Sequence, residues 1–264
     1  MILAEIIEEK RKSIQKAKDA LSLDEIKSAL SEKKIQKRNF KQAINQAHDI
    51  NIIAEIKKAS PTRGVIREDF DPNRIAQEYQ INGAAAISIL TEEKYFLGKL
   101  EYIRGVREVC SLPILRKDFI LEEYQVYESA LAEADAVLLI ADILSKEEIT
   151  NLSSIAKSLG LAVLCEAHSE EDLEKAISAK SDIIGINNRD LSTFKLSIDT
   201  TQNLIGLIPE GKVIVSESGI RSRSDTLFLK SLGVNAVLVG EVFMDADDIG
   251  AKVREFTGKS NGKG

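Results

Sequence analysis

Short apolar runs alternate with longer amphipathic stretches from residue 52 almost to the end of the chain. The runs are rich in Ile, Val, Leu and Ala, and their starts lie 21 to 32 residues apart. That distance fits one strand, one helix and two short loops. We therefore predict strands at residues 52–58, 84–92, 113–119, 136–142, 162–168, 183–189, 213–219 and 236–242.

The stretches between these runs carry apolar residues at helical spacing. Several begin with a residue that caps a helix, such as Asp71 before Pro72 and Ser145 before an acidic turn. We predict helices at residues 72–82, 99–110, 122–133, 146–159, 170–179 and 224–232.

The first 47 residues have a different pattern. Ile2, Ile6 and Ile7 belong to an apolar stripe of helical spacing. After a polar stretch, Ser22 precedes an acidic turn of the kind that begins a second helix. We expect residues 1–47 to be a helical extension packed on the rest of the chain.

Eight βα units in a row, with no linker and no break in composition, predict one (β/α)8 TIM barrel of the α/β class over residues 48–257. The length of 264 residues is close to the ~250 that such a barrel needs. An open doubly wound sheet is the alternative, but no glycine-rich dinucleotide fingerprint follows any strand. The polar residues 258–264 predict a disordered tail.

Composition narrows the classes of function. The net charge is −6 and no long basic block occurs, which disfavours a nucleic-acid partner. No apolar run approaches a membrane span or a signal peptide, so we expect no membrane association and a cytoplasmic location. Cys110 and Cys165 lie in apolar stretches without disulfide or metal-ligand spacing, and we expect both to be reduced core residues.

Polar residues occur late in five of the eight predicted strands, where barrel enzymes carry their active sites. In the first strand, Glu55 and Lys57 share one face while the other face is entirely apolar, so these two side chains point into the barrel. A single such charge is often a surface group or a structural ion pair. Several converging on one cavity have perturbed pKa values, as acid–base catalysis requires. The candidate catalytic residues are Glu55, Lys57, Lys117, Glu166, Asn187 and Glu217.

Small residues follow the seventh and eighth predicted strands. Ser218, Gly219 and Gly240 allow backbone N–H groups to approach an anion, and in barrels this pair of strands often binds a phosphate. The alternative is that these glycines are simple turn residues. The two histidines, His48 and His168, form no metal-ligand pattern, and we expect them to be structural or loop residues.

Six segments together resemble the indole-3-glycerol phosphate synthase family. The resemblance runs in order from the N-terminal helix to the eighth strand, and the first and fourth segments are highly specific. The segments are AEIKKASP (54–61), SILTE (88–92), YF (95–96), LRKDFI (115–120), GINNRDL (185–191) and SESGI (216–220).

The resemblance implies a ring closure in tryptophan biosynthesis. In this lyase reaction 1-(2-carboxyphenylamino)-1-deoxyribulose 5-phosphate loses carbon dioxide and water, with no metal or organic cofactor. It implies that Lys117 is the general acid that protonates the ribulose carbonyl oxygen, and that Glu166 acts in the later dehydration. The division of acid and base roles among Lys57, Lys117 and Glu166 stays open.

The same resemblance assigns the remaining residues to substrate binding. Lys57 pairs with the substrate carboxylate beside Glu55, and Asn187 and Glu217 bind ribulose oxygens. The phosphate-binding set is Ser60, Ser218, Gly219 and Gly240, and the slot for the anthranilate ring is Phe96, Phe119 and Leu138. Core packing is the alternative role for the apolar residues of that slot.

Two charged residues are expected near the predicted phosphate site. Arg189 follows the sixth strand and either reaches the site or forms a surface ion pair. Glu241 stands where many relatives have a small hydroxyl residue, so we expect its carboxylate to turn to solvent or to pair with a cation.

Two other functions are compatible with the fold. A different phosphosugar barrel, such as a phosphoribosylanthranilate isomerase, would lack the lysine in the first strand. The presence of Lys57 therefore disfavours this alternative. A catalytically silent barrel that serves as a binding subunit would have lost Lys57, Lys117 or Glu166, and all three are present. The expected partner is a small phosphorylated substrate, and the expected assembly is a monomer or a weak homodimer.

Overall fold

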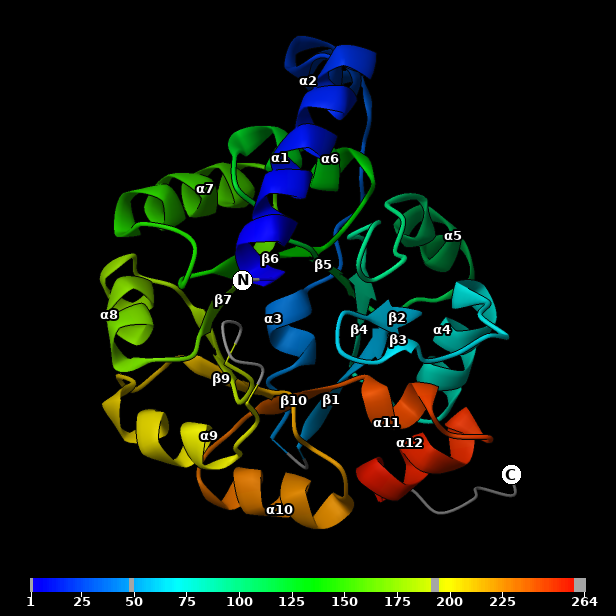
Figure 1. Cartoon of the computed structure of the whole chain (residues 1–264), viewed down its shortest axis with the longest axis vertical. Coiled ribbons are helices and arrows are strands. Elements are labelled where there is room, and N and C mark those ends of the chain that lie inside the picture. Colours follow the sequence, from blue (N-terminus) through cyan, green and yellow to red (C-terminus); the bar gives the residue numbers. More distant parts are fainter. Residues whose placement is uncertain (1, 48–49, 191–194, 259–264) are drawn as a thin grey trace.

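Eight parallel strands close into one barrel in the computed structural model, which describes residues 2–47, 50–190 and 195–258 (Figure 1). Around the barrel the order is β1-β10-β9-β8-β7-β6-β5-β4, with β4 pairing again with β1. The predicted barrel is therefore confirmed and the open sheet is wrong. The strands are β1 (Asn51–Ile56), β4 (Ala86–Leu90), β5 (Ile114–Lys117), β6 (Ala136–Ile140), β7 (Ala162–Ala167), β8 (Ile183–Asn187), β9 (Val213–Glu217) and β10 (Ala236–Val239).

Helices alternate with the strands and cover the outside of the barrel (Figure 1). Six of them match the predicted helices closely, and capping boxes begin three of these, at Ser145, Ser169 and Ser222. The prediction missed α9, the 3-10 turn after it, α11 and α12. The helices are α4 (Pro72–Ile81), α5 (Glu101–Val109), α6 (Glu123–Leu131), α7 (Lys146–Ser158), α8 (Glu170–Ser178), α9 (Asp199–Leu204), η1 (Ile205–Leu207), α10 (Arg223–Ser231), α11 (Glu241–Met244) and α12 (Ile249–Thr257).

Alternation along the strands separates an outer core from the barrel interior. On β1, Ile52 and Ile56 face outward into a cluster that includes Tyr79 of α4. Ile53 faces inward and packs with Leu115 and other residues of the surrounding strands. The predicted inward and outward faces of the first strand are confirmed.

The N-terminal segment is less helical than predicted. It contains α1 (Ile2–Ala20), α2 (Leu23–Glu32) and the single turn α3 (Phe40–Ala43), but residues 33–39 are not helical. In this stretch the Arg38 guanidinium donates to the carbonyls of Leu112 and Arg107, so tertiary hydrogen bonds replace helical ones.

The extension touches both ends of the barrel. Lys10 of α1 pairs with Asp118, which follows β5, so α1 lies at the carboxyl end of the strands. The Asn51 side chain, at the start of β1, donates to the carbonyl of Ile44 just after α3. Because the strands begin there, α3 covers the opposite, amino-terminal end.

A small hairpin that the sequence pattern did not predict follows β1. It consists of β2 (Ala59–Ser60) and β3 (Gly64–Val65), which pair antiparallel. Beyond it, the Arg67 guanidinium donates to the carbonyls of Met244 and Ala246. These bonds hold the loop after β1 against the chain that follows β10.

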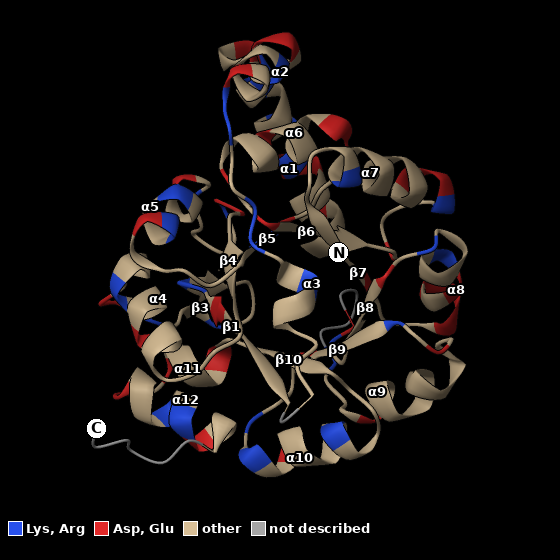
Figure 2. Ribbon diagram, turned by 180° about the vertical axis from the view of Figure 1, so that it is seen from behind, with Lys and Arg blue, Asp and Glu red and all other residues tan. Residues whose placement is uncertain are grey.

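Charged residues lie mainly on the helices and loops, while the strands are largely uncharged (Figure 2). Both cysteines are free and buried, as expected. Within the described ranges, no helix is long and apolar enough to cross a membrane. Gly258 ends α12 in a left-handed conformation. The rest of the predicted tail, and His48, lie outside the described residues.

Candidate active site

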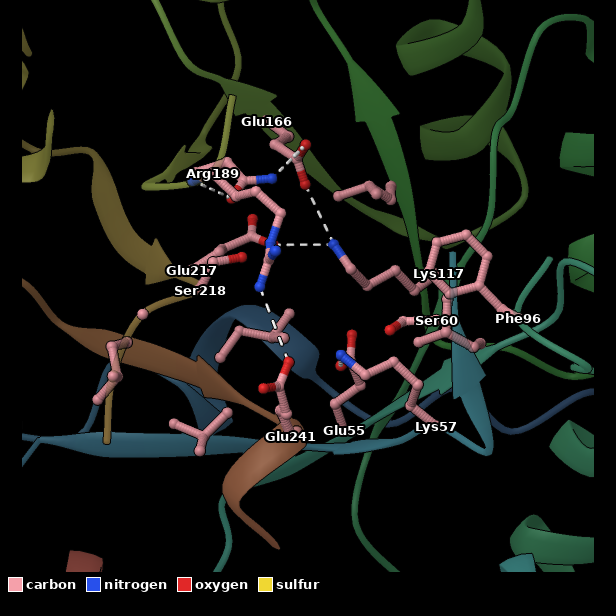
Figure 3. A pocket seen from close by; sticks show the side chains of 18 of the residues that line it. Glu55, Lys57, Ser60, Phe96, Lys117, Glu166, Arg189, Glu217, Ser218 and Glu241 are labelled. Carbon is pink, nitrogen blue, oxygen red and sulfur yellow. Dashed lines mark hydrogen bonds and ion pairs between the residues drawn. The ribbon is translucent and has the colours of Figure 1, made fainter. Parts of the chain in front are cut away.

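Six charged or polar side chains meet in one cavity at the carboxyl end of the strands (Figure 3). They come from β1 and the residue after it, β5, β7, β8 and β9, and each was predicted from the alternation of its strand. They are Glu55, Lys57, Lys117, Glu166, Asn187 and Glu217.

Lys117 lies between the carboxyl groups of Glu166 and Glu217. Its Nζ is 3.1 Å from Glu166 Oε2 and 3.0 Å from Glu217 Oε2. Burial disfavours the ammonium, but Glu166, Glu217 and Glu55 outweigh burial and raise the pKa of Lys117 well above its usual range. Lys117 therefore carries its proton throughout the neutral pH range.

Glu217 has an unusual environment for a carboxyl group. Burial raises its pKa to about 8; Lys117 opposes that rise and Glu166 adds to it. Its Oε1 is buried without a hydrogen-bond partner among the described residues. A Cβ at Gly185 would lie 2.3 Å from that oxygen, so glycine is needed there to leave room for the carboxyl group.

Glu55 and Lys57 form a second ion pair, with Lys57 Nζ 2.7 Å from Glu55 Oε2. A Cβ at Gly240 would lie 2.2 Å from the same Glu55 oxygen. Packing against Glu55 therefore requires glycine at position 240, which the sequence pattern did not reveal. The glycine lets the chain after β10 pass close to the carboxylate on β1.

Asn187 links Glu166 to the chain that carries Arg189. Its Nδ2 donates to Glu166 Oε1 at 2.9 Å, and its Oδ1 accepts from the Arg189 N–H at 3.0 Å. Asn187 therefore fixes the Glu166 carboxylate oxygen that does not contact Lys117.

Two phenyl rings and a leucine form an apolar wall of the cavity. The rings of Phe96 and Phe119 have centroids 6.3 Å apart, and Leu138 also lines the cavity. The loop that carries Phe96 is held by Glu92, whose carboxylate accepts from the N–H groups of Tyr95 and Phe96. The wall is therefore part of the cavity and packs with the barrel interior as well.

Small residues form another part of the cavity lining. Ser218 and Gly219 are both left-handed, with φ of 66° and 77°, and Gly240 precedes the single turn α11. Ser60 also lines the cavity. These are the residues of the predicted phosphate-binding set.

Glu241 pairs with two cations instead of remaining alone. Its carboxylate oxygens lie 3.1 Å from Arg63 Nη1 and 3.8 Å from Arg189 Nη2 (Figure 3 shows the second pair). Of the two expectations for Glu241, pairing with a cation is confirmed. Arg189 both lines the cavity and forms an ion pair with Glu241, so both of the alternatives predicted for it hold at once.

The cavity is lined by every predicted catalytic and substrate-binding residue and by others. Ile140 and Leu238 lie on the inward faces of β6 and β10, so the alternation of those two strands could have identified them. Leu196 could not be predicted, because its position depends on an isolated antiparallel β-bridge that it forms with Arg189. The additional apolar lining residues are Pro61, Leu90, Ile140, Leu196, Ile220, Leu238, Val239 and Val242.

His168 lies outside the cavity that holds the lysine and glutamate side chains. His168 Nδ1 is 2.7 Å from the carbonyl oxygen of Asn187, and the ring does not line the cavity. Across the described part of the chain, no cluster of His, Cys, Asp and Glu could hold a metal ion.

A closed (β/α)8 barrel with a buried lysine–carboxylate cluster at its carboxyl end defines a barrel enzyme equipped for acid–base chemistry. Comparison with known proteins specifies which one. A family model described as indole-3-glycerol phosphate synthase matches residues 3–256. The chain belongs to the indole-3-glycerol phosphate synthase family, and it is a lyase of tryptophan biosynthesis that carries out a decarboxylating ring closure.

Relatives of the same name match along their whole length. The indole-3-glycerol phosphate synthase of Clostridium acetobutylicum is 51% identical over 100% of both chains. That of Acetivibrio thermocellus is 46% identical, over 97% of this chain and 99% of the relative.

Solved structures of low identity share the fold. The 3-hexulose-6-phosphate synthase of Salmonella typhimurium has a TM-score of 0.63 at 16% identity, covering 79% of this chain and 97% of that one. A tryptophan synthase α-subunit of Pyrococcus furiosus has a TM-score of 0.60 at 14% identity, covering 80% and 99%. These likenesses support the barrel fold alone.

Proposed function

We propose that the cavity binds 1-(2-carboxyphenylamino)-1-deoxyribulose 5-phosphate and that Lys117 is the general acid of the ring closure. The observation that carries the proposal is the position of Lys117 between Glu166 and Glu217 in a largely buried cavity. Such an ammonium can protonate the ribulose carbonyl oxygen as the aromatic carbon attacks the carbonyl carbon. The new carbon–carbon bond then allows the carboxylate to leave as carbon dioxide.

Dehydration is the second half of the proposed reaction. The hydroxyl formed in the first half leaves as water when a cavity ammonium, that of Lys57 or Lys117, protonates it, and the new five-membered ring loses a proton as aromaticity returns. Glu166 is the proposed acceptor of that proton, because Asn187 and Lys117 hold its two oxygens at the cavity. Its ion pair with Lys117 gives a direct path by which the proton returns to the lysine.

Binding of the substrate carboxylate is assigned to Lys57. Glu55 holds the Lys57 ammonium at 2.7 Å, and that ammonium remains part of the cavity wall. The partnerless oxygen of Glu217 is available to a ribulose hydroxyl. Because the pKa of Glu217 is about 8, at neutral pH this group can donate a hydrogen bond as well as accept one.

The two remaining parts of the substrate are assigned to different residues of the cavity lining. The anthranilate ring is proposed to lie against Phe96, Phe119 and Leu138, which bury apolar surface. The phosphate is proposed to bind the backbone N–H groups near Ser218, Gly219 and Gly240 and the hydroxyl of Ser60, all of which line the cavity. Arg63 and Arg189 neutralise Glu241, which removes a repulsive charge from that part of the lining.

We further propose that the chain works in the cytoplasm as a monomer or a weak homodimer. Its partner is then a small phosphorylated substrate, without nucleic acid or membrane. The net charge of −6 supports the absence of a nucleic-acid partner. Sedimentation velocity at micromolar concentration tests the assembly, and a stable larger species would contradict it.

Two adjacent lysines provide a matched test of the proposed site. Lys57 lines the cavity, whereas Lys58 does not. With the carboxyphenylamino-deoxyribulose phosphate as substrate, native protein and Lys58→Ala should release carbon dioxide and form indole-3-glycerol phosphate, measured by mass spectrometry. Lys57→Ala should lose most of this activity. A folded native protein that forms no product would overturn the proposed reaction, and equal losses in both variants would overturn the role of Lys57.

A further inference from the structure

Helix α1 carries a buried lysine. Lys10 is 5% exposed, although most neighbouring charged residues on this helix reach solvent. Its Nζ lies 2.6 Å from Asp118 Oδ1, and the two side chains are 6% and 1% exposed. Lysine is almost never buried to this extent unless it is paired. The pair therefore joins the N-terminal helix to the chain directly after β5.

Asp118 is the centre of a hydrogen-bond network. The oxygen that contacts Lys10 also accepts from the Phe119 N–H at 2.8 Å. The other oxygen accepts from the Thr91 hydroxyl at 2.6 Å and from Arg116 at 3.0 Å. Both carboxylate oxygens are therefore fixed, and so is the backbone on the C-terminal side of Asp118.

The same network holds the backbone of Lys117. The Thr91 N–H donates to the Lys117 carbonyl at 3.1 Å, while the Thr91 hydroxyl donates to Asp118. Asp118 thus stands between the proposed general acid and Phe119 of the ring wall, and it is tied to the backbone of each neighbour. A shift of its carboxylate would move both groups that face the substrate.

A second contact of α1 supports this arrangement. Glu9 Oε2 lies 3.0 Å from Lys94 Nζ, in the loop that carries Phe96. Ile6 packs in the cluster that contains Phe119 and Leu138. Successive turns of α1 therefore contact both loops that supply the phenyl rings.

We infer that Lys10 is a positioning residue of the active site, which acts through Asp118 to set the positions of Lys117 and Phe119. The inference rests on the proposed function, because it assigns Lys10 to the same site. Lys10 does not line the cavity, so its contribution to the reaction is indirect. The alternative is that the ion pair only docks α1 on the barrel.

The test compares two lysines on the same helix. Lys10→Met keeps the length of the side chain and removes its charge, and Lys12→Met does the same at an exposed position paired with Glu8 and Glu9. The readouts are kcat per folded molecule well below the unfolding temperature, KM and the unfolding temperature itself. For Lys10→Met we expect kcat to fall by about 10- to 100-fold, as a misplacement of about 1 Å produces. Lys12→Met should keep the native kcat.

Each outcome is decisive. A Lys10→Met protein with native kcat and only a lower unfolding temperature would show that the lysine merely docks the helix, and the inference would be wrong. If Lys10→Met does not fold, Lys10→Gln removes the charge and keeps a hydrogen-bond donor; reduced kcat in this folded variant supports the inference, and unchanged kcat overturns it. If native protein itself forms no product, the proposed function fails instead, so the two failures are distinguishable.

Discussion

Two glycines make room for buried carboxylates that belong to the neighbouring strand. Gly185 on β8 lies against Glu217 of β9, and Gly240 after β10 lies against Glu55 of β1. In both places a Cβ atom would come within 2.3 Å of a carboxylate oxygen. The absence of a side chain at these positions is therefore part of the geometry of the acid–base cluster.

Gly185→Ala tests this reading. The new methyl group should push Glu217 away from Lys117 and lower kcat/KM by about 10- to 100-fold in a protein that still folds. Gly206→Ala is the matched control, because a Cβ there meets no atom within 4 Å. Steady-state kinetics of both variants decide the matter, and native kinetics for Gly185→Ala would show that Glu217 tolerates displacement.

The raised pKa of Glu217 predicts a pH dependence of stability. In the folded protein this group stays protonated up to about pH 8, whereas in the unfolded chain it ionises near its usual pKa. Between these two pKa values the folded protein therefore binds one more proton than the unfolded chain. The stabilisation that this proton provides is lost as pH rises toward 8. The unfolding free energy of native protein, relative to Glu217→Gln, should fall by up to ~1.4 kcal/mol per pH unit between about pH 5 and 8.

Urea unfolding of the two proteins at several pH values measures this difference. Glutamine cannot ionise, so titrations elsewhere in the molecule cancel. A constant difference from pH 5 to pH 8 would mean that Glu217 is already ionised in the folded protein.

Among the elements, the hairpin β2–β3 is held by exposed contacts to α11 and the chain after it. Arg63 pairs with Glu241 and Asp245 and is 43% exposed, so the pairs contribute only about 0–1 kcal/mol to stability. Arg63→Ala should therefore leave the unfolding temperature nearly unchanged while amide exchange in residues 59–66 becomes faster. Arg74→Ala, which removes an exposed pair with Asp69, is the control. Unchanged exchange in both variants would show that other contacts hold the hairpin.

Long, periodic elements could be predicted from the sequence, and short or tertiary ones could not. The eight strands and six helices were found because each carries a repeating pattern and several have caps. The strands β2 and β3 have two residues each, too few for any period. Helix α12 is recognisable from the sequence as well, since Asp248 caps it and Val253 and Phe256 lie on its buried face.

The residues of the site likewise fall into those that a local pattern predicts and those whose role depends on tertiary contacts. Glu55, Lys117 and Glu217 could be predicted because alternation alone decides that they point inward. The role of Asp118 could not, because it depends on Lys10, which local pattern does not relate to β5. The packing role of Gly240 likewise appears only when the first and last strands pair.

At the scale of the whole molecule, the two cysteines report on the integrity of the barrel. Cys165 on β7 is fully buried, and burial raises its pKa to about 12; burial also raises the pKa of Cys110. Neither thiol should react with Ellman's reagent in the native state, and both should react at once in denaturing urea. Rapid reaction of either one under native conditions would contradict a closed barrel with both residues in its core.

The central claim is that Lys117, held between Glu166 and Glu217, supplies the proton for ring closure. The chain contains no tryptophan, so the indole emission of the product can be followed directly. On addition of the carboxyphenylamino-deoxyribulose phosphate, emission should grow with native protein and with Lys58→Ala. With folded Lys117→Ala it should grow about 10²- to 10⁴-fold more slowly. Growth at the native rate in Lys117→Ala would contradict the account.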